Sequence, residues 1–150
     1  MIRQRLGKDL LFFDGGMGTL LQEKGLAPGE LPETWNLTHS EEIYKIHRQY
    51  IEAGSDIILT NTFGANALKF HDDSCSLEEI IKAAVSHVKK AEREALLQTG
   101  DERKIYTALD VGPTGKLLKP MGDLEFETAY EAFKAVSYTH LRAHETELHL

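Results

Sequence analysis

Residues 14–19, DGGMGT, combine one acidic side chain with backbone that can approach a ligand closely. They follow the apolar run Leu10–Phe13 and lead into a helical stretch. A carboxylate suits an ammonium group, and exposed backbone amides beside a helix start suit a carboxylate. An α-amino acid carries both groups. The segment therefore indicates either an amino-acid site at Asp14, Gly15 and Gly16 or an ordinary strand-to-helix turn, because Asp-Gly is common in turns.

The glycines of this segment do not form a nucleotide-binding motif. A dinucleotide fingerprint needs Gly-x-Gly-x-x-Gly and an acidic residue at the end of the next strand. Leu21 occupies the position of the third glycine, and the next predicted strand ends in Thr60 and Asn61. A P-loop needs Gly-Lys followed by Ser or Thr, which the sequence lacks. Both nucleotide interpretations fail.

Three apolar runs, each followed by an amphipathic helix, would position these residues. The predicted strands are Leu10–Phe13, Asp56–Thr60 and Lys104–Val111. Strands that alternate with long helices predict parallel pairing, as in doubly wound sheets and (β/α)8 barrels. In both folds ligand groups gather at the carboxyl ends of the strands, which here read DGGMGT, NTFGAN and GPTG. Asn61 and Thr62 are therefore further candidates for the pocket.

The helix boundaries also have local signals. Thr38 with Glu41, and Ser76 with Glu79, match the capping-box pattern. Gly100 stands where a C-terminal glycine cap belongs. The residues expected to face the core are Ile43, Ile46, Tyr50 and Ile51 in the first helix, Leu77, Ile80, Ile81, Ala84, Val88, Ala91 and Ala95 in the second, and Phe126, Ala129, Tyr130 and Phe133 in the third.

Composition and charge exclude several classes of partner. A chain of 150 residues suits one domain. The net charge of −7 and the scattered basic residues argue against nucleic acid. No apolar run is long enough to span a membrane or to form a secretory core. A single cysteine excludes an internal disulfide framework, and we expect a cytoplasmic protein.

Three single residues invite a functional interpretation. Cys75 lies alone in a polar loop ahead of a helix, and we expect a bystander. His47 falls on the apolar face of its helix, which is typical of a hydrogen-bonded core histidine. Trp35 either shields the site or packs beneath the long first loop, and the sequence leaves both alternatives open.

The segments DGGMGTLLQ, PETWN, IHRQYIEAGSDIILTNTFGAN and GPTG resemble, in order and spacing, the homocysteine S-methyltransferase family. They are most similar to the homocysteine-binding domain of its cobalamin-dependent members, over about Leu10–Ala135. The resemblance implies an α/β fold, the N-terminal three βα units of an incomplete (β/α)8 TIM barrel. It also implies methyl transfer to the thiol of homocysteine, giving methionine. Asp14 would meet the substrate ammonium, and the amides around Gly15 and Gly16 its carboxylate.

The resemblance also implies zinc and methylcobalamin as cofactors. Family members bind the homocysteine sulfur to zinc through three cysteines, in motifs such as Gly-x-Asn-Cys and Gly-Gly-Cys-Cys, which this sequence lacks. We therefore expect an inactive fragment without catalytic residues or metal ligands of its own. Its parent would also carry cobalamin- and folate-binding domains. The alternatives are S-methylmethionine or betaine as the methyl donor, or a non-catalytic barrel module that binds an amino acid.

Residues 136–150, VSYTHLRAHETELHL, have a different character. They depart from the apolar stripe of the preceding helix and resemble the in-frame translation of a transposase sequencing adapter. We expect a partial barrel at residues 1–135 and a non-native tail at 136–150 that buries little.

Overall fold

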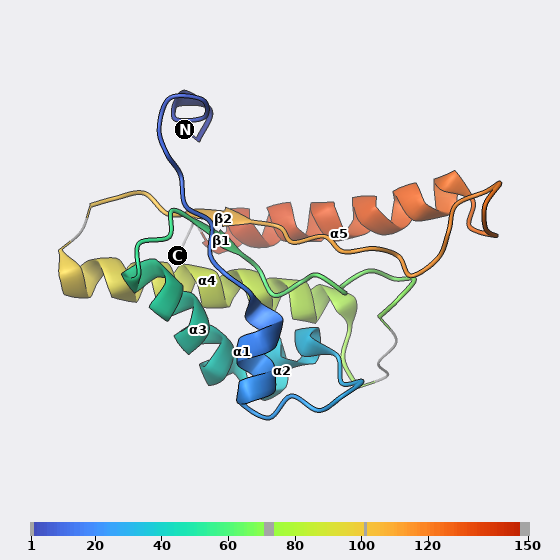
Figure 1. The fold of residues 1–150 in the computed structure, drawn as a ribbon, viewed down its shortest axis with the longest axis horizontal. Helices are drawn as coiled ribbons and strands as arrows, with labels where there is room; N and C mark the ends of the chain where they lie inside the picture. The colour runs from blue at the N-terminus through green and yellow to red at the C-terminus, as the bar shows by residue number, and fades with distance from the viewer. Residues whose placement is uncertain (1, 71–73, 101, 148–150) are drawn as a thin grey trace.

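The centre of the computed structural model, which describes residues 2–70, 74–100 and 102–147, is a small parallel sheet (Figure 1). Strands β1 (Ile57–Leu59) and β2 (Tyr106–Ala108) pair in parallel, with Ile58 opposite Thr107. The chain passes from β1 to β2 through helix α4 (Leu77–Thr99). The predicted α/β class with parallel pairing is confirmed.

The first predicted strand, Leu10–Phe13, is wrong in its extent. Only one parallel bridge forms, between Phe13 and Ile57, and the Asp14 amide donates to the Ile57 carbonyl at 3.0 Å. The Leu10 side chain is 76% exposed. Within the described part of the chain, this segment pairs with β1 alone, so its apolar side chains stay open to solvent. The segment still runs parallel to β1, as predicted, and places Asp14 beside the end of β1.

Helices α3 (Ser40–Glu52), α4 and α5 (Phe126–Glu147) form a layer against the sheet (Figure 1). Helix α4 packs against both α3 and α5, and it also contacts β2. Ile58 and Ile105 join Ile51 and Val88 in the core between sheet and helices. No helix among the described residues is long and apolar enough to cross a membrane. The remaining elements are η1 (Ile2–Gln4), α1 (Met17–Glu23), η2 (Pro32–Thr34) and α2 (Trp35–Thr38).

One of the two predicted capping boxes forms. Ser76 accepts from the Glu79 amide at 3.2 Å, and Glu79 accepts from the Ser76 amide at 2.8 Å. Gly100 ends α4 in the left-handed conformation, with φ of 66°. The box predicted at Thr38 is wrong, because Thr38 is the last residue of α2 and its hydroxyl donates back to the Thr34 carbonyl at 3.2 Å. His39 precedes α3 and makes no side-chain cap.

The apolar face predicted for the third helix is right in part: Ala129 is buried and Phe133 is half-buried, whereas Phe126 and Tyr130 are exposed. Phe126 is 69% exposed, and small side chains face α4 instead. Small residues let two helices approach closely, and this contact leaves the rings of Phe126 and Tyr130 exposed. The buried positions are Ala129, Ala132, Val136, His140 and Ala143.

This buried face continues into residues 136–150, so the expectation that this segment buries little is wrong. Val136 is 2% exposed and packs with Ile80 and Ile81 of α4. Residues 148–150 lie outside the described part of the chain. The foreign origin of the segment remains a prediction, which sequencing of the gene across these codons tests.

Candidate functional site

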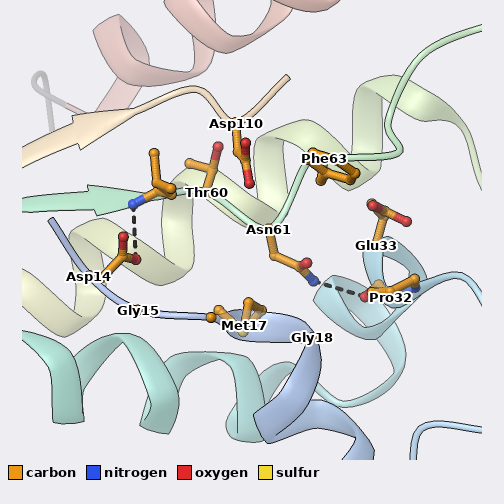
Figure 2. A pocket seen from close by; sticks show the side chains of 12 residues that line it. Asp14, Gly15, Met17, Gly18, Pro32, Glu33, Thr60, Asn61, Phe63 and Asp110 are labelled. Atoms are coloured by element: carbon orange, nitrogen blue, oxygen red, sulfur yellow. Dashed lines mark hydrogen bonds between the residues drawn. The ribbon is translucent and has the colours of Figure 1, made fainter. Parts of the chain in front are cut away.

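A cavity of about 440 Å³ opens where the chain leaves the carboxyl ends of the strands (Figure 2). The segment after the Phe13 bridge, the loops after β1 and β2, and helix η2 contribute its walls. The lining residues are Asp14, Gly15, Gly16, Met17, Gly18, Pro32, Glu33, Leu59, Thr60, Asn61, Phe63 and Asp110.

The Asp14 carboxylate bonds to β1 through one oxygen, and its other oxygen has no hydrogen-bond partner among the described residues. Its Oδ2 accepts from the Leu59 amide at 3.1 Å, whereas the buried Oδ1 has no partner among the described residues. Burial raises the pKa of Asp14 to about 6, and the nearby Asp110 carboxylate adds to the rise. A buried acceptor without a donor costs free energy, which a ligand that supplies an N–H group would recover.

The backbone of Gly15 and Gly16 passes unusually close to helix α3. A Cβ on Gly15 would lie 2.7 Å from the Tyr50 hydroxyl oxygen, so the path needs glycine there. The Tyr50 hydroxyl donates to the Gly16 carbonyl at 3.2 Å. The amides of Gly15 and Gly16 make no hydrogen bond with another described residue. Two donors therefore remain beside Asp14 in the cavity wall.

Asn61 and Thr62, the candidates after the second strand, have different positions. Asn61 lines the cavity, and its side-chain amide donates to the Pro32 carbonyl at 2.8 Å (Figure 2). Thr62 is buried behind the lining, where its hydroxyl donates to the Asp110 carbonyl at 2.9 Å. The structure thus brings Asp14, Gly15, Gly16 and Asn61 together and leaves Thr62 outside the cavity.

Two carboxylates in the lining were not anticipated from the sequence. Asp110 lies two residues past the end of β2, but the predicted strand continued to Val111, so the strand-end rule passed over it. Burial raises the pKa of Asp110. Glu33 is 2% exposed and accepts from the Gly64 amide, and nothing in its local sequence signals that burial. The lining holds these two carboxylates, Asp14 and no basic side chain, so it favours a cationic group.

The other candidate residues lie elsewhere. Trp35 packs with Leu21 and Ile46, and its indole nitrogen donates to Glu30 at 2.7 Å, so it packs and does not shield the cavity. Cys75 is partly exposed in a separate depression. In the described ranges, no group of three His, Cys, Asp or Glu side chains is arranged to hold a metal.

His47 is fully buried on α3, but the hydrogen bonds expected of it do not form. Neither ring nitrogen has a partner among the described residues. Burial lowers the pKa of His47 to about 3, and His87 contributes to the shift. The ring is therefore neutral near pH 7 and belongs to the core.

The chain belongs to the homocysteine S-methyltransferase family, whose pattern it matches over residues 11–145. It is similar to the methionine synthase of Mycobacterium leprae (strain TN), with 30% identity over 136 residues, 87% of this chain and 11% of that protein.

Solved structures show the fold. The metallated form of the homocysteine methyltransferase MmuM from Escherichia coli aligns with a TM-score of 0.78 and 21% identity, over 95% of this chain and 54% of its own. The apo form of the same protein aligns with a TM-score of 0.64 and 23% identity, over 94% of this chain and 47% of its own. The chain therefore spans about half of the solved relative and a small part of the methionine synthase.

Proposed function

We propose that the cavity binds homocysteine through its amino-acid end. The Asp14 carboxylate receives the ammonium group, the free amides of Gly15 and Gly16 receive the carboxylate, and Asn61 forms the adjoining wall. One observation carries the proposal: Asp14, which has an unpartnered carboxylate oxygen, lines the same cavity as Gly15 and Gly16, whose amides bond to no described residue, and the charged side chains of this cavity are all acidic. Thr62 supports the loop and does not contact the ligand.

The residues of this chain bind and orient the substrate. Above a pH of about 6 the Asp14 carboxylate is ionised, and an ammonium group then forms a charge-assisted hydrogen bond with it. The same contact removes the cost of the unpartnered oxygen. Fixing both ends of the amino-acid group restricts where the thiol lies, which favours reaction by reducing the orientational freedom of the substrate.

For the whole protein we propose methyl transfer to the homocysteine thiol, giving methionine, on a complete (β/α)8 barrel. Exposed apolar residues such as Leu10, Phe12 and Val111 support the barrel, because further strands would cover them. The outer edge of β2 also pairs with no described strand.

We propose zinc as the thiol-activating metal, but the described residues do not offer it a donor set. Its ligands would lie on other parts of the protein, and no step through zinc is assigned to this chain. Methylcobalamin is the proposed methyl donor, carried with folate by further domains as in cobalamin-dependent relatives.

Binding of a deaminated analogue tests the proposal. L-homocysteine and 4-mercaptobutanoate share the thiol and the carboxylate, and only homocysteine has the ammonium group. Titration calorimetry on the full-length protein should show at least about tenfold weaker binding of the analogue, the loss expected for one charge-assisted hydrogen bond. Equal affinities, or no binding of homocysteine, would contradict the proposal.

A further inference from the structure

We propose that Asn36 is a positioning residue for this pocket, which holds the Asn61 wall in place and is itself held by His87 of α4. The proposal rests on homocysteine as the ligand only where it predicts substrate affinity. Asn36 belongs to the PETWN segment, residues 32–36. Asn36 itself does not line the cavity, so we do not expect it to contact the substrate directly.

Asn36 and Asn61 are joined by a buried pair of contacts. The Asn36 side chain is 1% exposed, and its Nδ2 donates to the Asn61 carbonyl at 2.8 Å. The Asn61 Nδ2 lies 3.4 Å from the Asn36 Oδ1 and donates to the Pro32 carbonyl at 2.8 Å. Both the backbone and the side chain of Asn61 are therefore tied to residues 32–36.

The far end of the same loop is tied to the same segment. The Glu33 carboxylate accepts from the Gly64 amide, and a Cβ on Gly64 would lie 2.8 Å from Glu33 Oε1. Residues 32–36 thus form hydrogen bonds with the loop after β1 at Asn61 and at Gly64, three residues apart. We call this set of hydrogen bonds the loop clamp.

His87 anchors the clamp from the helical layer. Its Nε2 lies 2.7 Å from the Asn36 carbonyl oxygen, and a carbonyl only accepts, so His87 donates this hydrogen bond. His87 is half-buried on α4 and does not line the cavity. A chain of hydrogen bonds therefore connects α4 through Asn36 to the pocket wall, a route by which a residue remote from the ligand affects its binding.

The first test replaces the donor of Asn36 with an acceptor. Asn36→Asp keeps the shape but places a carboxylate oxygen against the Asn61 carbonyl, which repels it. In the full-length protein without substrate, we expect faster hydrogen exchange of the Gly64 and Ala65 amides. With substrate, we expect the homocysteine KM to rise about tenfold while kcat changes little, because the clamp acts on binding.

Thr38→Ala is the matched control, since Thr38 lies on the same short helix as Asn36, and its hydroxyl bonds to the Thr34 carbonyl and to His39, neither of which takes part in the loop clamp. It should leave both exchange and KM unchanged. Unchanged loop exchange in Asn36→Asp would overturn the clamp. A fall in kcat with KM unchanged would overturn its role in substrate positioning.

The second test guards against a variant that simply folds poorly. His87→Gln keeps an N–H donor and should retain a nearly normal KM, whereas His87→Leu loses the donor and should raise KM several-fold. Equal effects of the two substitutions would overturn His87 as the anchor. If the wild-type protein binds no homocysteine, the proposed function fails, and the exchange measurement still decides whether the clamp exists.

Discussion

One oxygen of the Asp14 carboxylate bonds to the Leu59 amide, and the other is buried without a partner among the described residues. The pKa of the Asp14 carboxyl group is raised to about 6 from an ordinary value of 3.8. A raised acid pKa favours the folded state below the unfolded value, and this contribution is lost as the pH rises through 6. Asp14 therefore lowers the stability of the ligand-free protein near neutral pH. A binding role explains why an unpaired carboxylate stands at this position.

His47 gives the opposite pH dependence and a prediction at the scale of one residue. Its pKa falls from 6.5 to about 3 on folding, so its contribution to stability is complete above pH 6.5 and is lost as the pH falls from there toward 3. We expect His47→Leu to reduce this loss of stability at low pH. The difference in the free energy of unfolding between variant and wild type should change by up to about 1.4 kcal/mol per pH unit.

Urea unfolding of both proteins between pH 5 and pH 8 checks this expectation. The difference between the two profiles isolates His47 from Asp14, which titrates in an overlapping range. Parallel profiles would show that His47 has its ordinary pKa in the folded protein.

At the scale of the element, the two candidate capping boxes provide a matched pair. Ser76→Ala removes a hydroxyl that accepts from the Glu79 amide, and we expect a loss of about 1 kcal/mol in the free energy of unfolding. Thr38→Ala removes a hydroxyl that caps no helix, so its effect should be within ~0.5 kcal/mol. Chemical denaturation measures both, and equal losses would contradict the observed helix boundaries.

The GPTG segment has a glycine that the loop after β1 requires. A Cβ on Gly112 would lie 2.4 Å from the Phe63 carbonyl oxygen, which also accepts from the Gly112 amide at 2.8 Å. Gly112→Ala should therefore lower the free energy of unfolding by about 1–3 kcal/mol, as overpacking does. Gly18→Ala is the control, because no atom lies within 4 Å of its Cβ position. Similar melting temperatures for the two variants would contradict the close approach of these loops.

Local signals in the sequence predicted the elements whose causes are local. The Ser76 box and Gly100 bound α4 because cap chemistry depends on neighbouring residues. The length of the first strand and the burial of Phe126 and Tyr130 on α5 depend on what packs beside them, so local sequence alone predicted them wrongly. In the cavity, Asp14, Gly15, Gly16 and Asn61 follow from the strand-end rule. Glu33 does not, because its position depends on a loop distant in sequence.

At the scale of the whole molecule, helix α5 connects residues 136–147 to the core. Val136→Ala should lower the free energy of unfolding by roughly 2 kcal/mol, since it uncovers Ile80 and Ile81 and leaves a cavity. Leu141→Ala, on the exposed face of the same helix, should change it little. Thermal unfolding of both variants measures the difference. An unchanged free energy of unfolding in both variants would show that this segment does not pack against α4.

Substrate binding in this cavity depends most on Asp14 as the ammonium contact. Asp14→Asn keeps the shape and a hydrogen-bonding group but removes the charge, and Asp123→Asn removes the same charge from an exposed position outside the cavity. We expect calorimetry on the full-length protein to show homocysteine affinity reduced roughly tenfold to a hundredfold in Asp14→Asn, with zinc content unchanged. Asp123→Asn should bind like the wild type. Unchanged affinity in Asp14→Asn would contradict the assignment, because asparagine serves a turn about as well as aspartate.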